Sequence, residues 1–361
     1  MKRIPFPYHC VILVVLSVLL QACQPRLVPF NENVPAQTLS YLGAPPVVDA
    51  RVRFREILCG LLDRNRQRLG LDVECDNYLW RLNDEPQVSA GPKSLPAYDP
   101  GLKILMVPGA FSDCFKDIGL PYQEAAKRFR QMGYHIDNID VDGMSSSPKN
   151  AAIIAEAVAK QDSGPAERLI LLGYSKGTTD ILHFLVNYPE LARKVSAVLS
   201  VAGAVNGSPL ADRYSKTSYD NWFALLSFGR CRPGDGGVLD SLSRTRQFQW
   251  LATHPLPQQV RYYSLAAFAR YENVQLHQRV TYKLLEPIEP LNDGQLLYFD
   301  QIIPGASLLG YVNADHWTVA VPVEEDFSYR DPALMAQNRH LRGLLFEALI
   351  LFLTEDLKSA R

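Results

Sequence analysis

The chain alternates short apolar runs with stretches whose apolar residues recur at helical spacing. Short apolar runs are typical of strands buried on both faces, and the stretches between them are typical of crossover helices that join parallel strands. The runs that we predict as strands are residues 103–107, 135–142, 168–173, 195–203, 260–268 and 308–312. The pattern therefore predicts an α/β fold with a mostly parallel central sheet flanked by helices.

Helical spacing predicts helices near residues 122–129, 150–160, 179–186 and 338–357. Before the first strand, Phe54, Ile57, Leu58, Leu61 and Leu62 also recur at helical spacing, so residues 51–100 are predicted as an N-terminal helical extension. The alternation breaks at residues 206–250, which hold loops, glycines and an apolar cluster. We expect a cap there, inserted into a domain that spans residues 101–361.

The N-terminus reads as a targeting signal. Lys2 and Arg3 precede an apolar run at residues 11–20, which is too short to span a bilayer comfortably. The run ends in "LQAC", which resembles the lipobox of bacterial lipoproteins, although Gln21 stands where that family usually has a small residue. The resemblance implies cleavage after residue 22 and a lipid on Cys23. An ordinary signal peptide or an uncleaved anchor is the alternative.

The resemblance also implies a location. Residues 23–50 are predicted as the lipidated N-terminus and a proline-rich, polar tether. A lipid-anchored chain of this kind is expected in the bacterial cell envelope, at the periplasmic face of the outer membrane.

Composition narrows the function classes. Of 361 residues 47% are hydrophobic, which predicts a globular chain, and the formal net charge is -1 without a basic stripe, which argues against nucleic acid as a partner. None of the seven histidines falls at metal-ligand spacing, and no phosphate-binding glycine loop occurs. The sequence therefore predicts no metal and no other cofactor.

Four cysteines remain once Cys10 in the signal and Cys23 are set aside: Cys59, Cys75, Cys114 and Cys231. An even number in an exported chain predicts two disulfides, with three possible pairings, and four free buried thiols are the alternative. We expect Cys59–Cys75, which would staple the extension locally. We also expect Cys114–Cys231, which would tie the cap to the turn "PGAF" at residues 108–111.

The stretch "GYSKG", residues 173–177, follows a predicted strand and precedes a predicted helix. This is the context that a Gly-x-Ser-x-Gly nucleophile turn needs. Glycines two positions either side of Ser175 avoid collisions at a sharp turn, and the positive end of the helix favours a developing oxyanion. The alternative is a turn serine that caps the helix.

Two further candidate residues follow Ser175 along the chain, first an aspartate and then a histidine. This is the order in which the acid and the base follow such a nucleophile turn. Asp293 lies in "NDG" after a late strand, and His316 lies in "ADHW" after the last strand. Asp293 could instead be only a turn residue and His316 a structural histidine, and Asp300 and Asp240 are the reserve acids. Asp315, next to the histidine, is poorly placed to orient its neighbour's ring and is expected to be a loop residue.

Together, "VPGAF", "GYSKG", "NDG" and "ADHW" resemble the α/β-hydrolase superfamily, within its lipase and esterase members, over roughly residues 103–357. The resemblance implies Ser175 as nucleophile, His316 as base and Asp293 as the orienting acid. It also implies an oxyanion hole from the backbone N–H groups of Ala110 and Lys176, and we expect the Lys176 ammonium in solvent. "VPG" replaces the family's more usual His-Gly, and the segment before residue 103 has no counterpart in the family.

The expected function is an exported serine hydrolase that cleaves small-molecule or lipid carboxylic esters through an acyl-enzyme. The same triad could serve a thioesterase, an amidase or an acyltransferase, and a catalytically silent envelope scaffold is a further alternative. The apolar cluster of the cap could line an acyl pocket or simply pack the cap onto the sheet; its residues are Trp222, Phe223, Leu225, Leu226 and Phe228.

Overall fold

The central sheet is parallel throughout its described strands. The structure is a computed structural model, and it describes residues 43, 45–82, 85, 94–114, 119–161, 168–213, 232–322 and 332–358. Within these residues the sheet has seven strands in the order β1-β7-β6-β5-β4-β2-β3. They are β1 (Val48–Asp49), β2 (Leu102–Val107), β3 (His135–Asn138), β4 (Arg168–Tyr174), β5 (Val195–Val201), β6 (Arg261–Ala267) and β7 (Ser307–Val312).

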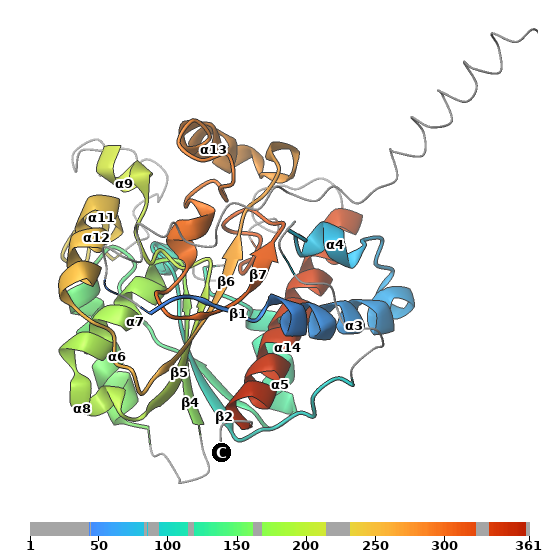
Figure 1. The fold of residues 1–361 in the computed structure, drawn as a ribbon, viewed down its shortest axis with the longest axis horizontal. Helices are drawn as coiled ribbons and strands as arrows, with labels where there is room; N and C mark the ends of the chain where they lie inside the picture. The colour runs from blue at the N-terminus through green and yellow to red at the C-terminus, as the bar shows by residue number, and fades with distance from the viewer. Residues whose placement is uncertain are drawn as a thin grey trace, which may run out of the picture.

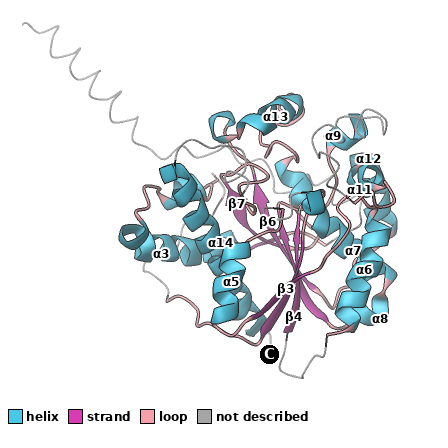
Figure 2. Ribbon diagram, turned by 180° about the vertical axis from the view of Figure 1, so that it is seen from behind, coloured by secondary structure: helices cyan, strands magenta, loops and turns pink. Residues whose placement is uncertain are grey.

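Helices cover both faces of the sheet (Figures 1 and 2). One face carries α3 (Arg51–Leu69), α5 (Gln123–Gln131) and α14 (Pro332–Lys358). The other carries α6 (Ser147–Ala159), α7 (Lys176–Asn187) and α8 (Pro189–Ala192). The shorter helices are α4 (Cys75–Tyr78), α9 (Pro209–Arg213), α11 (Val238–Leu242), α12 (Arg244–Thr253) and α13 (Arg279–Leu285). Single 3₁₀ turns are η1 (Ser112–Cys114), η2 (Tyr271–Asn273), η3 (Leu276–Gln278) and η4 (Tyr298–Gln301).

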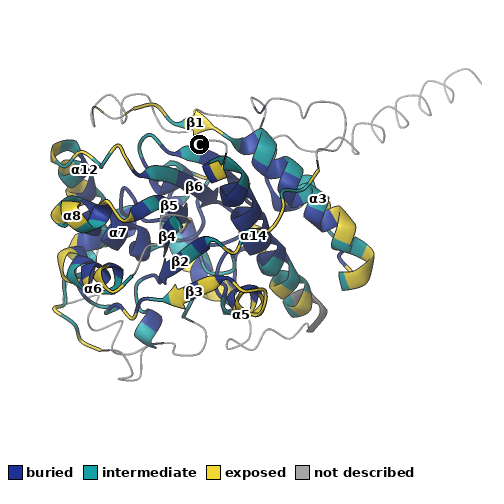
Figure 3. Ribbon diagram, turned by 90° about the horizontal axis from the view of Figure 1, so that it is seen from below, coloured by how far each residue is buried: buried dark blue, intermediate teal, exposed yellow. Residues whose placement is uncertain are grey.

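The strands are apolar on both faces because each face meets a layer of helices. In β2, Ile104 and Met106 pack into the core with α3, α5 and α14, whereas Leu105 and Val107 pack into the core with α6 and α7. Figure 3 shows the resulting buried interior, with exposed residues on the outer sides of the helices. This two-sided burial explains the near-continuous apolar runs in the sequence.

The N-terminal extension belongs to this same core. β1 pairs in parallel with β7, and Phe54 of α3 meets Phe352 of α14 edge to face, with ring centroids 6.1 Å apart. β1 lies within residues 23–50, so the predicted tether extends past the point where the sheet begins. The Arg55 guanidinium is buried in the extension and forms ion pairs with the carboxylates of Glu85 and Asp76.

The predicted disulfide Cys59–Cys75 is confirmed and joins α3 to α4. Cys114 is also disulfide-bonded. Its expected partner, Cys231, lies outside the described residues, so that pairing stays a prediction. The neighbours of the two cysteines do meet, because the backbone N–H of Arg232 donates to Asp113 Oδ2 at 2.9 Å.

The predicted long elements are confirmed, with shifted ends. Helix α6 begins at Ser147 rather than at residue 150, because the Ser146 hydroxyl accepts a hydrogen bond from the Lys149 N–H at 3.4 Å and Pro148 suits the first turn. Helices α11 and α12 lie in the predicted cap, but its apolar cluster at residues 222–228 lies outside the described residues.

Among the described helices, none combines the length and the apolar character needed to cross a bilayer. The apolar run at residues 11–20 and Cys23 lie outside the described residues.

Candidate active site

Ser175 occupies a sharp turn between β4 and α7. Its backbone has φ 53° and ψ -127°, a conformation that residues other than glycine rarely adopt. Glycines make the turn possible: a Cβ on Gly173 would lie 2.5 Å from the Thr178 Cα, and one on Gly177 would lie 2.1 Å from the Val107 carbonyl oxygen. The turn therefore holds the serine at the carboxyl edge of the sheet.

A chain of hydrogen bonds joins Ser175 to His316 and Asp293. The Ser175 Oγ lies 2.8 Å from His316 Nε2, and His316 Nδ1 lies 2.7 Å from Asp293 Oδ2. An ionised carboxylate can only accept, so Nδ1 carries the ring proton and Nε2 accepts from the serine hydroxyl. The three residues follow β4, β6 and β7, whose carboxyl ends meet at one edge of the sheet.

The Asp293 carboxylate is fully buried and held in place by further donors. Its Oδ1 accepts from the backbone N–H groups of Gln295 at 2.8 Å and Leu296 at 2.7 Å, and its Oδ2 accepts from Gln301 Nε2 at 3.2 Å. Gln301 is itself fixed, because its amide exchanges two hydrogen bonds with the backbone of Ala267 at the end of β6. Nothing in the sequence pattern singled out Gln301.

Tyr174 and Asp293 each hold His316 in two ways. The Tyr174 hydroxyl donates to the His316 carbonyl oxygen at 2.7 Å, and the two rings stack with centroids 5.5 Å apart. The Asp293 carbonyl accepts from the His316 backbone N–H at 2.8 Å, in addition to the bond between the side chains. The sequence pattern did not mark Tyr174 as a site residue. Its position next to Ser175 was the one feature that could have pointed to it.

The reserve acids lie in other contacts. Asp300 forms an ion pair with Arg244, with Oδ2 2.7 Å from Nε, and accepts from Asn206 Nδ2 at 3.2 Å. Burial raises the pKa of Asp300 to about 6, against the opposing effect of Arg244. Asp240 is exposed and lies 3.4 Å from Arg246. In the described part of the chain, neither carboxylate has a hydrogen bond to His316.

Asp315 stabilises the turn that follows the histidine. Its Oδ1 accepts from the backbone N–H groups of Trp317 at 3.1 Å and Thr318 at 2.9 Å, and its Oδ2 accepts from the Gln275 N–H at 2.9 Å. Burial raises the pKa of Asp315, and these donors oppose that shift. The carboxylate therefore supports the loop and makes no bond to the neighbouring ring among the described contacts.

The predicted oxyanion loop runs directly beside Ser175. A Cβ on Gly109 would lie 2.9 Å from the Ser175 Cβ, so only glycine permits this approach. The next residues are Ala110 and Phe111, and Phe111 has φ 64° and donates its N–H to the Gly143 carbonyl at 3.2 Å. Outside the regular elements, the described backbone hydrogen bonds include none from the N–H of Ala110, which leaves that group as a candidate donor.

Comparison with solved structures then identifies the family. The metagenomic carboxyl esterase MGS0156 is 37% identical, with a TM-score of 0.77, over 94% of this chain and 99% of that chain. The chain belongs to the α/β-hydrolase superfamily. Lipase BlEst2 of Bacillus licheniformis, in its mature form, is 19% identical with a TM-score of 0.48 over 68% of this chain and 96% of that chain. No protein-family model and no curated protein matches the sequence.

In this α/β hydrolase the side chain of Lys176 is buried, so the prediction of a solvated ammonium group is wrong. Lys176 is 1% exposed, and its Nζ donates to Asp180 Oδ1 at 2.6 Å. Asp180 also accepts from Ser147 Oγ at 2.5 Å and from Asn150 Nδ2 at 2.7 Å. The first turn of α7 packs against the start of α6, and the carboxylate one helical turn later compensates the buried charge.

The described end of the predicted cap is tied to two stretches, the turn η1 after β2 and the residues that follow β3. The Arg232 guanidinium lies 2.7 Å from Asp140 Oδ1 and donates to the Val141 carbonyl at 2.9 Å, in addition to the contact with Asp113. Asp113 immediately precedes Cys114 in η1. These contacts fix this end of the predicted cap near the predicted oxyanion loop.

The variant Tyr174→Phe tests whether the tyrosine hydroxyl aligns His316 with Ser175. In Tyr174→Phe the ring remains but the His316 carbonyl loses its donor, so the imidazole should be less well aligned with Ser175. We expect the second-order rate of fluorophosphonate labelling of Ser175 to fall about tenfold, because small misalignments lower reaction rates strongly. Tyr262→Phe is the matched control, since that hydroxyl also donates to a backbone carbonyl, that of Pro257, at 3.0 Å. Equal rates in the wild type and Tyr174→Phe, or equal losses in both variants, would contradict the alignment role.

Proposed function

We propose that this α/β hydrolase cleaves carboxylic esters through an acyl-enzyme on Ser175. The observation that carries the proposal is the chain of hydrogen bonds from Ser175 Oγ through His316 to Asp293, at 2.8 and 2.7 Å. The strained turn at Ser175 adds support, because it presents the hydroxyl at the carboxyl edge of the sheet. Similarity to a carboxyl esterase over nearly the whole chain favours an ester as the substrate.

In the proposed mechanism, His316 Nε2 takes the proton from Ser175 Oγ while the oxygen forms a bond to the ester carbonyl carbon. The carbonyl oxygen becomes an oxyanion, which the backbone N–H groups of Ala110 and Lys176 would stabilise. When the tetrahedral intermediate collapses, the bond to the alcohol oxygen breaks and His316 gives its proton to that oxygen. The alcohol leaves and the acyl group stays on Ser175.

Water then repeats the sequence. His316 takes a proton from water, the water oxygen attacks the acyl carbon, and the proton returns to Ser175 Oγ as the carboxylic acid leaves. Throughout both steps, Asp293 keeps the proton on His316 Nδ1 and stabilises the imidazolium that forms. The donors from Gln295, Leu296 and Gln301 keep the Asp293 carboxylate in the geometry for this role.

Ser175→Ala tests the nucleophile. We expect a fluorophosphonate probe to label the wild type and not the variant, because only the serine hydroxyl can form the covalent adduct. Hydrolysis of p-nitrophenyl esters of increasing chain length should be lost in the same variant, while a matched thioester and amide panel compares the leaving groups. Labelling that persists in Ser175→Ala would refute the proposal, and a wild type that turns over only thioesters or amides would replace the ester assignment.

Asp293→Asn tests the acid, with Asp300→Asn as the matched control. An amide at 293 favours the wrong tautomer of His316, because its NH₂ group donates to Nδ1, so turnover per labelled active site should fall by a factor on the order of 10³–10⁴. Asp300 is equally buried but bonds Arg244, so its amide variant should retain turnover within a few-fold. Near-normal turnover in Asp293→Asn, together with loss in Asp300→Asn, would exchange their roles.

We also propose that Cys23 carries a lipid that anchors the enzyme to the bacterial envelope. The proposal rests on the short apolar run that ends in "LQAC". In a bacterial host, the wild type should incorporate labelled palmitate and fractionate with membranes, and Cys23→Ser should lose both. Unchanged processing and fractionation in the variant would reduce the site to an ordinary signal cleavage.

A further inference from the structure

A network of buried polar side chains joins α7 to α6 directly after the turn at Ser175. Its members are Lys176, Asp180, Ser147 and Asn150, and none of the four is more than 1% exposed. The Asp180 carboxylate lies at its centre and accepts from Lys176 Nζ at 2.6 Å and from Asn150 Nδ2 at 2.7 Å. Each polar side-chain atom of the four has at least one hydrogen bond, and satisfied buried networks are rigid.

Lys176 belongs both to this network and to the predicted oxyanion hole. Its ammonium group is bonded to Asp180, whereas its backbone N–H is one of the two predicted donors. Lys176 is the first residue of α7, so this N–H has no carbonyl within the helix to bond. Because the side chain is anchored to α6 through Asp180 and Asn150, it limits how far the N–H of the same residue can turn.

Asn150 connects the network to the loop that carries Ala110, the other predicted donor. The Asn150 amide accepts from the Asp142 N–H at 3.1 Å and donates to the Asp142 carbonyl at 3.0 Å. The next residue, Gly143, accepts from the Phe111 N–H at 3.2 Å. A Cβ on Gly143 would lie 2.7 Å from the Phe111 nitrogen, so the two backbones approach closely. The chain of bonds therefore ends at the residue that follows Ala110.

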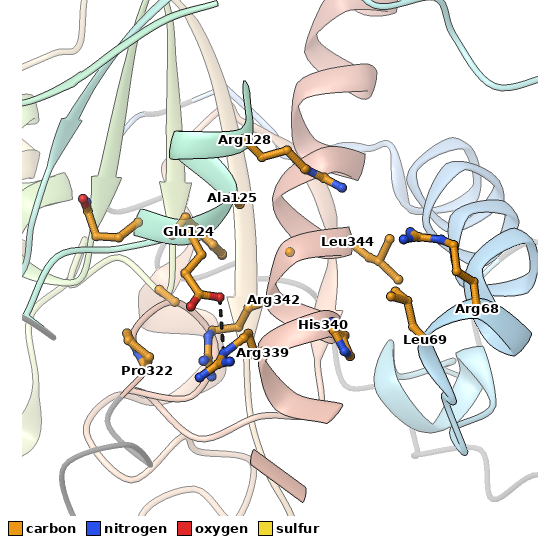
Figure 4. Close-up of a pocket in the computed structure, with 14 residues that line it drawn as sticks. Arg68, Leu69, Glu124, Ala125, Arg128, Pro322, Arg339, His340, Arg342 and Leu344 are labelled. Atoms are coloured by element: carbon orange, nitrogen blue, oxygen red, sulfur yellow. Dashed lines mark ion pairs between the residues drawn. The ribbon is translucent and has the colours of Figure 1, made fainter. Parts of the chain in front are cut away.

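The network lies apart from the cavity of about 310 Å³ between α3, α5 and α14 (Figure 4). None of the four network residues belongs to the lining of that cavity, which lies on the other face of the sheet from α6 and α7. The polar atoms of the network bond one another and the backbone. The network therefore acts by holding the chain in place rather than by taking a ligand from this cavity.

We propose that Asp180 and Asn150 are positioning residues, which together hold the backbone N–H groups of Lys176 and Ala110 where an oxyanion requires them. This role rests on the proposed function, because the two N–H groups matter to the reaction only if an oxyanion forms at Ser175. Both residues act through the backbone. Their loss should therefore weaken binding of the transition state and leave binding of the substrate unchanged.

Asn150→Ala tests this role on the full chain, with Asn206→Ala as the matched control. Asn206 is equally buried, and its amide also donates to a buried aspartate, Asp300, at 3.2 Å. Fluorophosphonate labelling taken to completion counts the folded active sites, and kcat/KM for a p-nitrophenyl ester is expressed per site. We expect a loss of roughly tenfold in Asn150→Ala, part of the 10²–10³ that a whole oxyanion donor supplies, and no more than a few-fold change in Asn206→Ala.

Two inhibitors separate positioning from a general loss of structure. With an alkyl trifluoromethyl ketone, Ser175 Oγ bonds to the ketone carbon, its proton passes to His316, and the ketone oxygen becomes an oxyanion. The corresponding secondary alcohol has the same shape and forms no oxyanion. In Asn150→Ala the inhibition constant of the ketone should rise by the factor by which kcat/KM falls, while that of the alcohol stays within about twofold.

A double variant, Lys176→Met with Asp180→Asn, tests the other end of the network. It keeps the backbone N–H at position 176 and removes both charges together, so no unpaired charge is left buried. We expect the same selective loss of ketone binding. This variant also decides the question if Asn150→Ala does not fold.

Unchanged ketone affinity in the folded variants would overturn the positioning role. Parallel losses for the ketone and the alcohol, or an equal loss in Asn206→Ala, would mean that the network supports only the fold. If the fluorophosphonate does not label the wild type, the proposed function fails and the positioning role falls with it. A labelled wild type with unchanged variants refutes the positioning role alone.

Discussion

The candidate active site depends on the strained turn at Ser175. A non-glycine residue at φ 53° is unfavourable by itself, and it persists because the elements around it leave the backbone no alternative. β4 is hydrogen-bonded to strands on both sides and fixes the entry to the turn, while α7 packs against α6 and fixes the exit. Gly109, Gly173 and Gly177 admit the close approaches that this geometry demands.

The side chains of His316 and Asp293 are positioned by strand ends that meet the Ser175 turn at one edge of the sheet. His316 and Asp293 come from loops after β7 and β6, and loops alone would hold them loosely. Tyr174, next to the nucleophile, binds the His316 backbone, and Gln301 connects the Asp293 carboxylate to the end of β6. The two contacts link the loops to the strands, so the alignment of the three groups follows from the rigidity of the sheet.

Charged groups are buried close to this site, and each has a partner. Lys176 pairs with Asp180 beneath the nucleophile turn, and Asp300 pairs with Arg244 beside the loop that holds Asp293. Removing Lys176 or Arg244 would leave a buried carboxylate without its cation, and breaking a buried pair in this way destabilises other proteins by about 3–5 kcal/mol.

The sequence by itself determined the layers of the fold and pointed to Ser175 and His316 as two of the three candidate site residues. Apolar runs with helical stretches between them can bury both faces of each strand only in a parallel sheet, and "GYSKG" between a strand and a helix can be read as a nucleophile turn because glycine spacing is a local steric requirement. The Asn-Asp-Gly turn favoured Asp293, but Asp300 stayed a candidate because both acids lie between the last two predicted strands. Only the tertiary structure brings one of them to His316. The same holds for β1, for the buried Lys176 and for Tyr174 and Gln301, because strand pairing, burial and hydrogen bonds between separate elements depend on packing that no local pattern records.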